Sequence, residues 1–190
     1  MEKSLCRKEF SARRKAMPAA VRSRADAEIR ALIRALPEFG AAPGAAGFVA
    51  FGAEPDLRPL FVEVPFYLPR FEAAEGRYAM VRVRDPEREL VPGRYGILEP
   101  RPELPAADET LRRELLYLVP AVACDRAGNR IGRGGGWYDR ILADVRRAPV
   151  AVIYACQLSE EALPCEEHDL AMGLIVTEAG VLRCAGAAEK

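Results

Sequence analysis

Residues 118–142 read LVPAVACDRAGNRIGRGGGWYDRIL, and this stretch carries the strongest indication of the fold in the chain of 190 residues. An apolar run ends at Val122 and predicts a buried strand, and the polar residues after it predict a turn. A helical pattern then covers residues 137–147. Four glycines lie between the turn and this helix: Gly132, Gly134, Gly135 and Gly136.

This glycine loop has the composition of an anion-binding segment. Glycines permit positive φ angles and let the backbone approach a ligand closely. Consecutive amide groups before a helix suit a phosphate group. Arg130 and Arg133 add positive charge that can donate two hydrogen bonds to phosphate or carboxylate oxygens. A glycine run alone is only moderately specific, because a plain turn explains such a run about half of the time.

Asp139 falls in the first turn of the predicted helix. A carboxylate there is favourable to the helix dipole, which is the simpler explanation of its position. Next to a bound triphosphate it would instead repel the ligand unless a cation stood between them. Mg²⁺ bridging the carboxylate and the phosphates would resolve that repulsion.

Two familiar phosphate motifs are absent from the loop. It lacks the Lys-Ser/Thr pair of a P-loop, and its glycines do not follow the G-x-G-x-x-G order of dinucleotide-binding domains. The next apolar run, residues 150–155, also ends without the acidic residue that would hold a ribose. A nicotinamide-dependent dehydrogenase is therefore disfavoured.

The rest of the chain predicts a single-domain α/β protein over residues 1–190. Helices are expected at residues 3–17 and 18–36. In the first, Cys6, Phe10 and Met17 form an apolar stripe. A basic stripe beside it holds Lys3, Arg7 and Arg14. The apolar face of the second helix is expected to hold Val21, Ala25, Ile29, Leu32 and Leu36.

Strands are expected at residues 47–51, 64–68, 78–84, 116–122, 150–155, 173–177 and 181–184. Apolar strands separated by helices predict a Rossmann-like sheet, mostly parallel, with helices on both faces. The Pro-rich segment 85–109 is long for a plain connection and is expected to form a functional loop.

Composition restricts the class of partner. Lys plus Arg and Asp plus Glu each total 28, so the excess positive charge typical of nucleic-acid or membrane-surface proteins is missing. Five scattered cysteines with no C-x-x-C spacing indicate free thiols in a reducing compartment. We therefore predict a cytoplasmic protein with no nucleic-acid or membrane partner. A monomer with small-molecule substrates is expected as well, although composition does not determine either property. The segment GRGGGWYDR has the composition of an RGG-type RNA-binding segment, but it occurs once in a neutral chain, so this alternative is weak.

The loop GNRIGRGGGWYDR resembles the signature of the 5-formyltetrahydrofolate cyclo-ligase family, G-x-R-x-G-x-G-x-G-[YF]-Y-D. The resemblance extends from Lys3 to about Val181. Its other landmarks, in order, are Lys3 and Arg7, Glu54 with Asp56, residues 68–70, 96–100, 119–120, Gln157, residues 163–164, His168 with Asp169, and Thr177 with Glu178.

The resemblance implies a ligase that uses ATP and Mg²⁺ and acts on a reduced folate. ATP would transfer its terminal phosphoryl group to the formyl oxygen, and the nitrogen at position 10 would then close the ring. The implied nucleotide-binding residues are Lys3, Arg7, Arg130, Ile131, Gly132, Arg133, Gly134, Gly135, Gly136, Trp137 and Tyr138. The implied folate-binding residues are Val49, Glu54, Arg133, Gly134, Gly135, Gly136 and Trp137.

The catalytic candidates are Glu54, Arg133 and Tyr138, and the metal candidates are Asp139 and Asp169. Glu54 would either bond the pterin or carry a proton. Glu99 is expected near the nucleotide, and His168, the only histidine, is expected beside the site without being a ligand.

Simpler interpretations exist for each residue outside the resemblance. Lys3 and Arg7 could be part of a solvated helix face, and Glu54 could be an ordinary loop carboxylate. Asp169 could cap the strand at 173–177, and Trp137 and Tyr138 could be core aromatics.

The chain also departs from the family pattern. Trp137 replaces a Tyr or Phe, Cys124 replaces a common Phe, and Pro55 with Leu57 alters the acidic motif around Glu54. The stretch between Pro59 and Pro69 is shorter than usual, so a helix there is expected to be clipped. That difference leaves open an ATP-dependent paralogue acting on another formyl or carboxyl compound.

Overall fold

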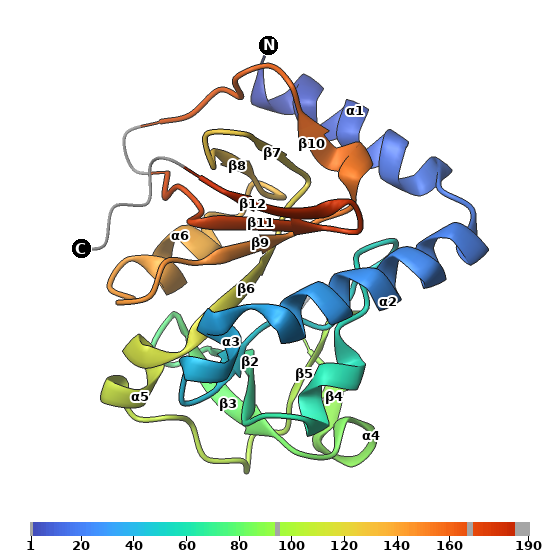
Figure 1. Ribbon diagram of the computed structural model, residues 1–190. Helices are drawn as coiled ribbons and strands as arrows, with labels where there is room; N and C mark the ends of the chain where they lie inside the picture. The colour runs from blue at the N-terminus through green and yellow to red at the C-terminus, as the bar shows by residue number, and fades with distance from the viewer. Residues whose placement is uncertain (1, 94–95, 167–168, 185–190) are drawn as a thin grey trace.

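The computed structural model describes residues 2–93, 96–166 and 169–184. A seven-stranded sheet crosses the molecule in the order β12-β11-β9-β6-β1-β2-β3 (Figure 1). Its five inner strands are parallel: β11 (Leu174–Thr177), β9 (Val150–Val152), β6 (Leu116–Pro120), β1 (Ala45–Ala46) and β2 (Phe66–Glu72). The antiparallel edge strands are β12 (Gly180–Arg183) and β3 (Arg77–Val83). The predicted α/β class, with a mostly parallel sheet, is confirmed.

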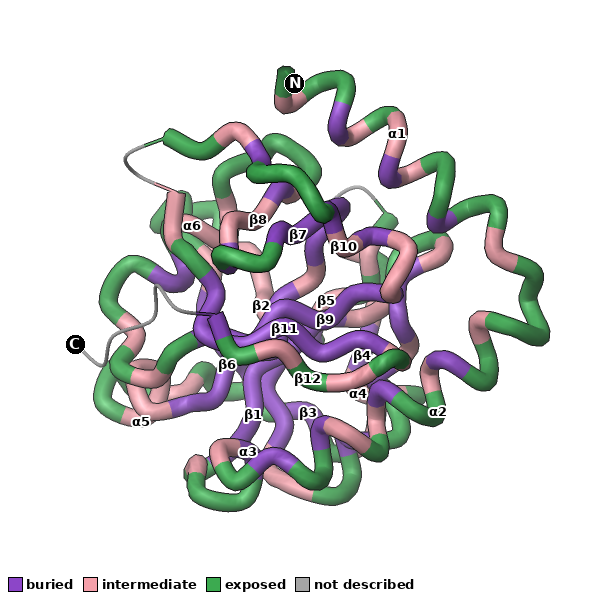
Figure 2. Tube along the Cα trace, turned by 45° about the horizontal axis from the view of Figure 1, so that its top comes forward, coloured by how far each residue is buried: buried purple, intermediate pink, exposed green. Residues whose placement is uncertain are grey.

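Helices cover both faces of this sheet (Figure 1). On one face lie α2 (Ala19–Ala35), α3 (Pro37–Ala41) and the 3-10 helix η1 (Arg58–Val62). On the other lie α5 (Glu109–Glu114) and α6 (Trp137–Leu142). Alternate residues of the strands supply the two cores, so Val152 packs toward α2 while Ala151 and Ile153 pack toward α6. Figure 2 shows the resulting pattern, in which the central strands are buried and the outer surfaces of the helices are exposed.

Smaller elements surround one end of the sheet. The N-terminal helix α1 (Lys3–Ala16) buries Cys6 and Phe10 against Val122 and Ile131. A three-stranded sheet lies beneath it and comprises β10 (Leu158–Ser159), β7 (Ala123–Asp125) and β8 (Arg130–Ile131), with the 3-10 helix η3 (Ala155–Gln157) leading into β10. Segment 85–109 forms α4 (Pro86–Glu89) and a hairpin of β4 (Leu90–Pro92) and β5 (Leu98–Pro100).

Several predicted boundaries were wrong. The strand expected at 47–51 lies earlier in the chain, at Ala45–Ala46. The Gly47 amide makes the last ladder bond, to Tyr67 O at 2.9 Å, and the chain then leaves the sheet. The helix expected at 137–147 ends at Leu142, and the Arg146 amide donates instead to Arg113 O at 3.0 Å. The strands expected at 116–122 and 150–155 also end earlier, at Pro120 and Val152.

The apolar face predicted for the second helix also needs correction. Val21 is 51% exposed, while Ala25, Ile29 and Ile33 supply the buried face. Val21 lies in the first turn of α2. The first residue of this helix that packs into the core is Ala25, so the Val21 side chain remains exposed to solvent. Within the described residues, none of the helices combines the length and apolar character needed to cross a membrane.

Candidate functional site

A cavity of about 470 Å³ opens where β1 and β6 end. The chain leaves β1 toward β2 on one side, whereas β6 lies on the other side of β1 and continues toward β9. In open α/β sheets, ligands bind at such a switch point, beyond the carboxyl ends of the strands. Phe48 and Val49, which follow β1, form part of the cavity wall. Pro120, at the end of β6, and the next residues, Ala121 and Val122, also line it.

The glycine loop forms a second wall of the cavity. Gly134 has a φ of 97° and Gly136 a φ of 64°, which are backbone conformations that glycine adopts without strain. Gly136 is the residue from which α6 begins. A β-carbon at Gly134 would lie in van der Waals contact with the Arg7 guanidinium, 3.4 Å from its carbon, so the positive φ is what favours glycine there.

The helix α1 brings two cations to this loop. Arg7 Nε donates to Gly132 O at 2.9 Å, which ties the helix to the loop backbone. Lys3 Nζ lies 2.7 Å from Asp169 Oδ2 and 3.0 Å from Glu166 Oε1. The hydrogen bond to Asp169 raises the pKa of Lys3, so the ammonium is charged at neutral pH. Lys3 and Arg7 of the basic stripe predicted on this helix therefore line the cavity, and Arg14, the third member, is buried.

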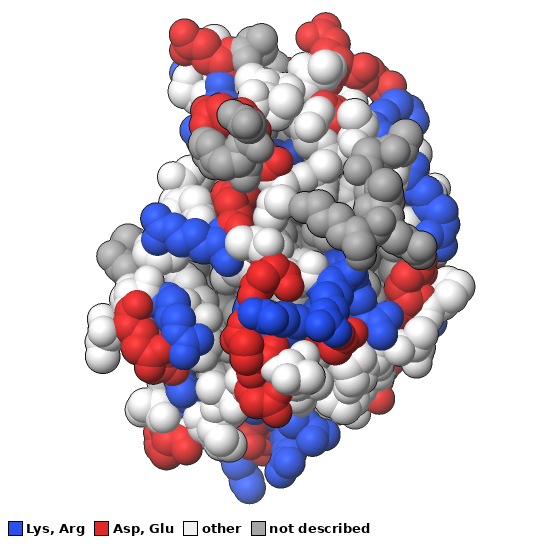
Figure 3. Space-filling view, turned by 90° about the vertical axis from the view of Figure 1, so that its left-hand side faces the viewer, with Lys and Arg blue, Asp and Glu red and all other residues white. Residues whose placement is uncertain are grey.

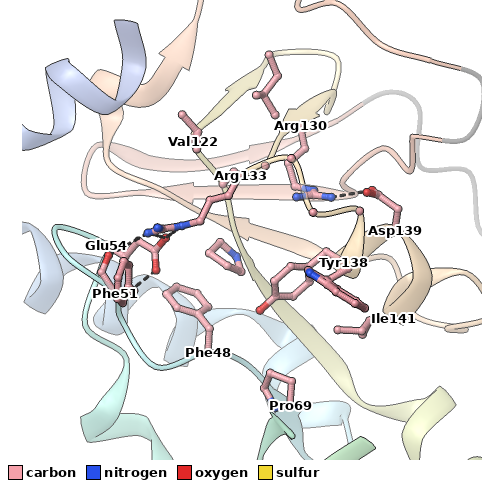
Figure 4. Close-up of a pocket in the computed structure, with 18 of the residues that line it drawn as sticks. Phe48, Phe51, Glu54, Pro69, Val122, Arg130, Arg133, Tyr138, Asp139 and Ile141 are labelled. Carbon is pink, nitrogen blue, oxygen red and sulfur yellow. Dashed lines mark hydrogen bonds and ion pairs between the residues drawn. The ribbon is translucent and has the colours of Figure 1, made fainter. Parts of the chain in front are cut away.

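Glu54 and Arg133 meet at the same cavity from opposite sides (Figure 4). Arg133 donates from Nε and Nη2 to Glu54 Oε1, at 3.1 and 2.7 Å. The Phe51 amide donates to Glu54 Oε2 at 3.0 Å. Glu54 is only 9% exposed, so these donors stabilise a charge that is largely removed from water.

The opposite end of the cavity is aromatic. Trp137 makes edge contacts with Phe71 and Tyr78, with ring centroids 5.5 and 5.1 Å apart. Tyr138 lies beside it on α6, and burial raises the pKa of its hydroxyl, which is therefore protonated at neutral pH. Flat apolar walls next to a few fixed polar groups are typical of small-molecule sites.

The two metal candidates both line the cavity and are both ion-paired. Arg130 Nη2 lies 2.7 Å from Asp139 Oδ1, and Asp169 pairs with Lys3. Across the described ranges of the chain, no three His, Cys, Asp or Glu side chains gather into a metal-binding group. Mg²⁺ commonly uses one or two carboxylates and completes its shell with phosphate oxygens and water. The residues present therefore fit a metal ion that arrives with a phosphate ligand, but not a complete cage made by the protein.

The structure also places the remaining predicted residues. Val49, Ile131 and Gly135 line the cavity, and so does Glu99, whose Oε2 accepts from the Phe71 amide at 3.1 Å beside the aromatic group. Asp56 does not line it and instead binds Arg58 through Oδ1 and Oδ2, at 2.9 and 2.8 Å. His168 lies outside the described residues.

Some residues that line the cavity were not among those predicted from the sequence. Tyr78, Phe48 and Phe51 line the cavity from three different segments. The sequence offered one indication of Tyr78, because an aromatic residue there begins a predicted strand, but nothing in the local pattern placed it opposite Trp137. The sequence placed Arg14 on the basic stripe of the first helix, but it did not indicate that the Arg14 side chain is buried.

The switch-point cavity, the glycine loop and the convergent ionic groups define an α/β enzyme with a small-molecule site. Residues 1–178 match the model of the 5-formyltetrahydrofolate cyclo-ligase family. The chain belongs to this family of ligases.

Relatives and solved structures agree with this assignment. A 5-formyltetrahydrofolate cyclo-ligase of Escherichia coli K12 is 33% identical over 142 residues, covering 70% of this chain and 77% of the relative. One of Mycolicibacterium smegmatis is 44% identical over 91 residues, covering 46% of this chain and 45% of the relative. The solution structure of Aquifex aeolicus 5,10-methenyltetrahydrofolate synthetase superposes with a TM-score of 0.85 at 31% identity, covering 100% of this chain and 96% of the other.

Proposed function

We propose that this enzyme uses ATP and Mg²⁺ to cyclise 5-formyltetrahydrofolate to 5,10-methenyltetrahydrofolate, releasing ADP and phosphate. One observation carries the proposal beyond family membership. A single cavity is lined by the cationic glycine loop, by an aromatic wall around Trp137, and by the ion pair of Arg133 with Glu54. A triphosphate and a pterin are the two kinds of group that such ends would recognise.

The cationic end would hold the phosphates. Lys3 and Arg7 present charge from α1, and Arg130 and Arg133 present it from the glycine loop. Arg7 also anchors Gly132 through its carbonyl, which favours a loop already arranged for binding. Phosphoryl transfer needs mainly position and charge from the protein, so fixed donors of this kind would lower the barrier directly.

The aromatic end would hold the folate. Trp137 and Tyr138 supply flat walls, and Val49 adds an apolar contact. The glycines at residues 134–136 have no side chain, so their backbone can approach a bound folate closely. Glu54 is held in place by Arg133 and by the Phe51 amide, so its carboxylate is positioned to accept hydrogen bonds from the pterin N–H groups.

The chemistry would proceed in two steps that balance. The formyl oxygen attacks the terminal phosphorus of ATP, forming an O–P bond and releasing ADP. The nitrogen at position 10 then attacks the activated carbon and loses its proton, and the C–O bond breaks to release phosphate as the ring closes. Arg133, which lines the cavity from the glycine loop, would stabilise charge on the transferred group.

Asp139 and Asp169 would hold Mg²⁺, which neutralises charge on the phosphates when it is bound. Each carboxylate would then exchange its present cation for the metal. Arg130 and Lys3, released from Asp139 and Asp169, would be free to contact phosphate oxygens.

The test is to incubate the purified protein with ATP, Mg²⁺ and 5-formyltetrahydrofolate and to record the absorbance of the methenyl product. We expect the absorbance to rise with equal release of ADP. A folded protein that gives no chromophore would contradict the proposal. Release of ADP with a different formyl or carboxyl acceptor, and not with this folate, would indicate the paralogue with another substrate.

A further inference from the structure

A buried arginine that the proposed chemistry does not use lies beside Glu54. Arg14, on α1, is 4% exposed, and its Nη1 atom is 3.7 Å from Glu54 Oε1. Its Nε and Nη1 atoms donate no hydrogen bond to the part of the chain that the structure describes. Buried charged groups are normally fully hydrogen-bonded, because removing them from water is costly. Arg14 is therefore a cation with unused donors next to a carboxylate.

Arg133 is a second cation on the same carboxylate oxygen, in a very different setting. Its side chain is 47% exposed and extends from the glycine loop across the cavity to Glu54 (Figure 4). The Arg14 side chain is 5% exposed and is carried by a helix of 14 residues. Arg133 also donates to Phe51 O at 3.1 Å and lies over the Phe51 ring, but nearly half of its side chain is in solvent, so it is freer to move than the buried Arg14.

We propose that Arg14 is a positioning residue that keeps Glu54 paired when Arg133 turns from Glu54 toward the phosphates of a bound nucleotide. The inference rests on the proposed function, in which Arg133 contacts those phosphates. Without Arg14, the departure of Arg133 would leave the buried Glu54 carboxylate with the Phe51 amide as its one hydrogen-bond donor among the residues that the structure describes. With Arg14 present, a small approach from 3.7 Å would form the missing hydrogen bond.

The charges around the pair favour this exchange. Burial is the largest cause that lowers the pKa of Arg14; the negative charge of Glu54 raises this pKa, and the positive charge of Arg133 lowers it. The two guanidinium groups therefore repel each other across one carboxylate. When Arg133 leaves, the repulsion is removed and the attraction between Arg14 and Glu54 is retained. Arg14 stays charged throughout, because guanidinium groups do not lose their proton in proteins.

The experiment is a double-mutant cycle on nucleotide binding. The dissociation constant of a non-hydrolysable ATP analogue with Mg²⁺ is measured by calorimetry for the wild type, Arg14→Met, Glu54→Gln and the double variant. We expect R14M to weaken binding about tenfold, in the range typical of coupling between sites. In the E54Q background the same change should alter binding by less than about threefold, because a neutral amide needs no counter-ion. Arg13→Met, which changes an exposed arginine of the same helix, is the matched control and should bind like the wild type.

A packing role for Arg14 would give a different result. In that case R14M would weaken binding by the same factor with Glu54 or with Gln at this position, and the inference would be overturned. Equal binding by the wild type and R14M would overturn it as well. Thermal unfolding shows whether each variant is folded, and Arg14→Gln replaces R14M in the cycle if R14M is not. Failure of the wild type to bind the analogue would overturn both this inference and the proposed function, whereas tight binding without coupling would overturn this inference alone.

Discussion

Lys3 Nζ lies 2.7 Å from Asp169 Oδ2, although 166 positions separate the two residues in the chain. The pair joins the first turn of α1 to the segment that precedes β11, and both residues line the cavity. Asp169 Oδ2 also accepts from the Glu166 amide at 2.8 Å, which holds the carboxylate in place. One end of the site is thus assembled from the two ends of the described chain.

We expect Lys3→Gln to lower kcat/KM for ATP about 100-fold, because a fixed charge near the phosphates would be lost. Steady-state kinetics with varied ATP measure this effect. The matched control is Lys8→Gln, which removes an exposed lysine of the same helix and should leave kcat/KM unchanged. Equal losses in both variants would indicate a general effect of charge on α1.

Asp139→Asn should raise the Mg²⁺ concentration needed for half-maximal activity by about tenfold or more, because an amide is a weaker ligand than a carboxylate for a hard cation. Arg130→Gln removes the present partner of Asp139 and serves as the comparison. It should raise the KM for ATP without the same change in Mg²⁺ dependence. If both variants shift the Mg²⁺ dependence alike, Asp139 acts only by holding Arg130.

Trp137 is the only tryptophan of the chain and lines the cavity, so its fluorescence reports on that wall directly. We expect 5-formyltetrahydrofolate to change its emission in a saturable manner without ATP. Trp137→Phe should keep activity within about tenfold, because an aromatic wall remains, whereas Trp137→Ala should lose more. An emission unchanged by folate but altered by ATP alone would reverse the assignment of the two ends.

The five cysteines should differ sharply in reactivity. Cys165 is exposed, whereas Cys6, Cys124 and Cys184 are buried, and burial raises the pKa of Cys124 and Cys184. The thiolate is the reactive form, so these groups should react slowly in the folded protein. A thiol reagent followed by mass spectrometry should label Cys165 first, and labelling of all five should require denaturant.

Ile29→Ala should lower the free energy of unfolding by about 2–5 kcal/mol, because Ile29 is fully buried between α2 and the sheet. Denaturant titration measures the change. Val21→Ala, on the same helix, should change stability by less than about 0.5 kcal/mol, since Val21 is 51% exposed. A large loss from V21A would contradict the buried face observed for this helix.

The surface charge agrees with the neutral composition. Figure 3 shows basic and acidic side chains interspersed over one face of the molecule. Elsewhere in the described chain, oppositely charged side chains form ion pairs, including Arg112 with Glu109 and Asp144, at 2.7 and 2.5 Å, and Arg126 with Glu160, at 2.8 Å.

Local patterns in the sequence determined the fold class and the glycine loop. Apolar runs of strand length separated by helical periodicity predict a covered parallel sheet, and the four glycines before Trp137 permit a backbone that approaches a ligand closely. The ends of elements were harder to predict, because they depend on partners elsewhere in the chain. The helix beginning at Trp137 ends early where Arg113 accepts the Arg146 amide, and no local pattern contains that bond.

The sequence by itself determined the α/β sheet, the glycine loop and, through the ordered landmarks, the family. Only the tertiary structure decided that Arg133 and Arg14 converge on one oxygen of Glu54, and that Phe71 and Tyr78 meet Trp137. The physical reason is that periodicity reports which face of an element is buried, but not which distant residue covers it. Ion pairs and ring contacts between distant segments form only when the sheet order brings those segments together.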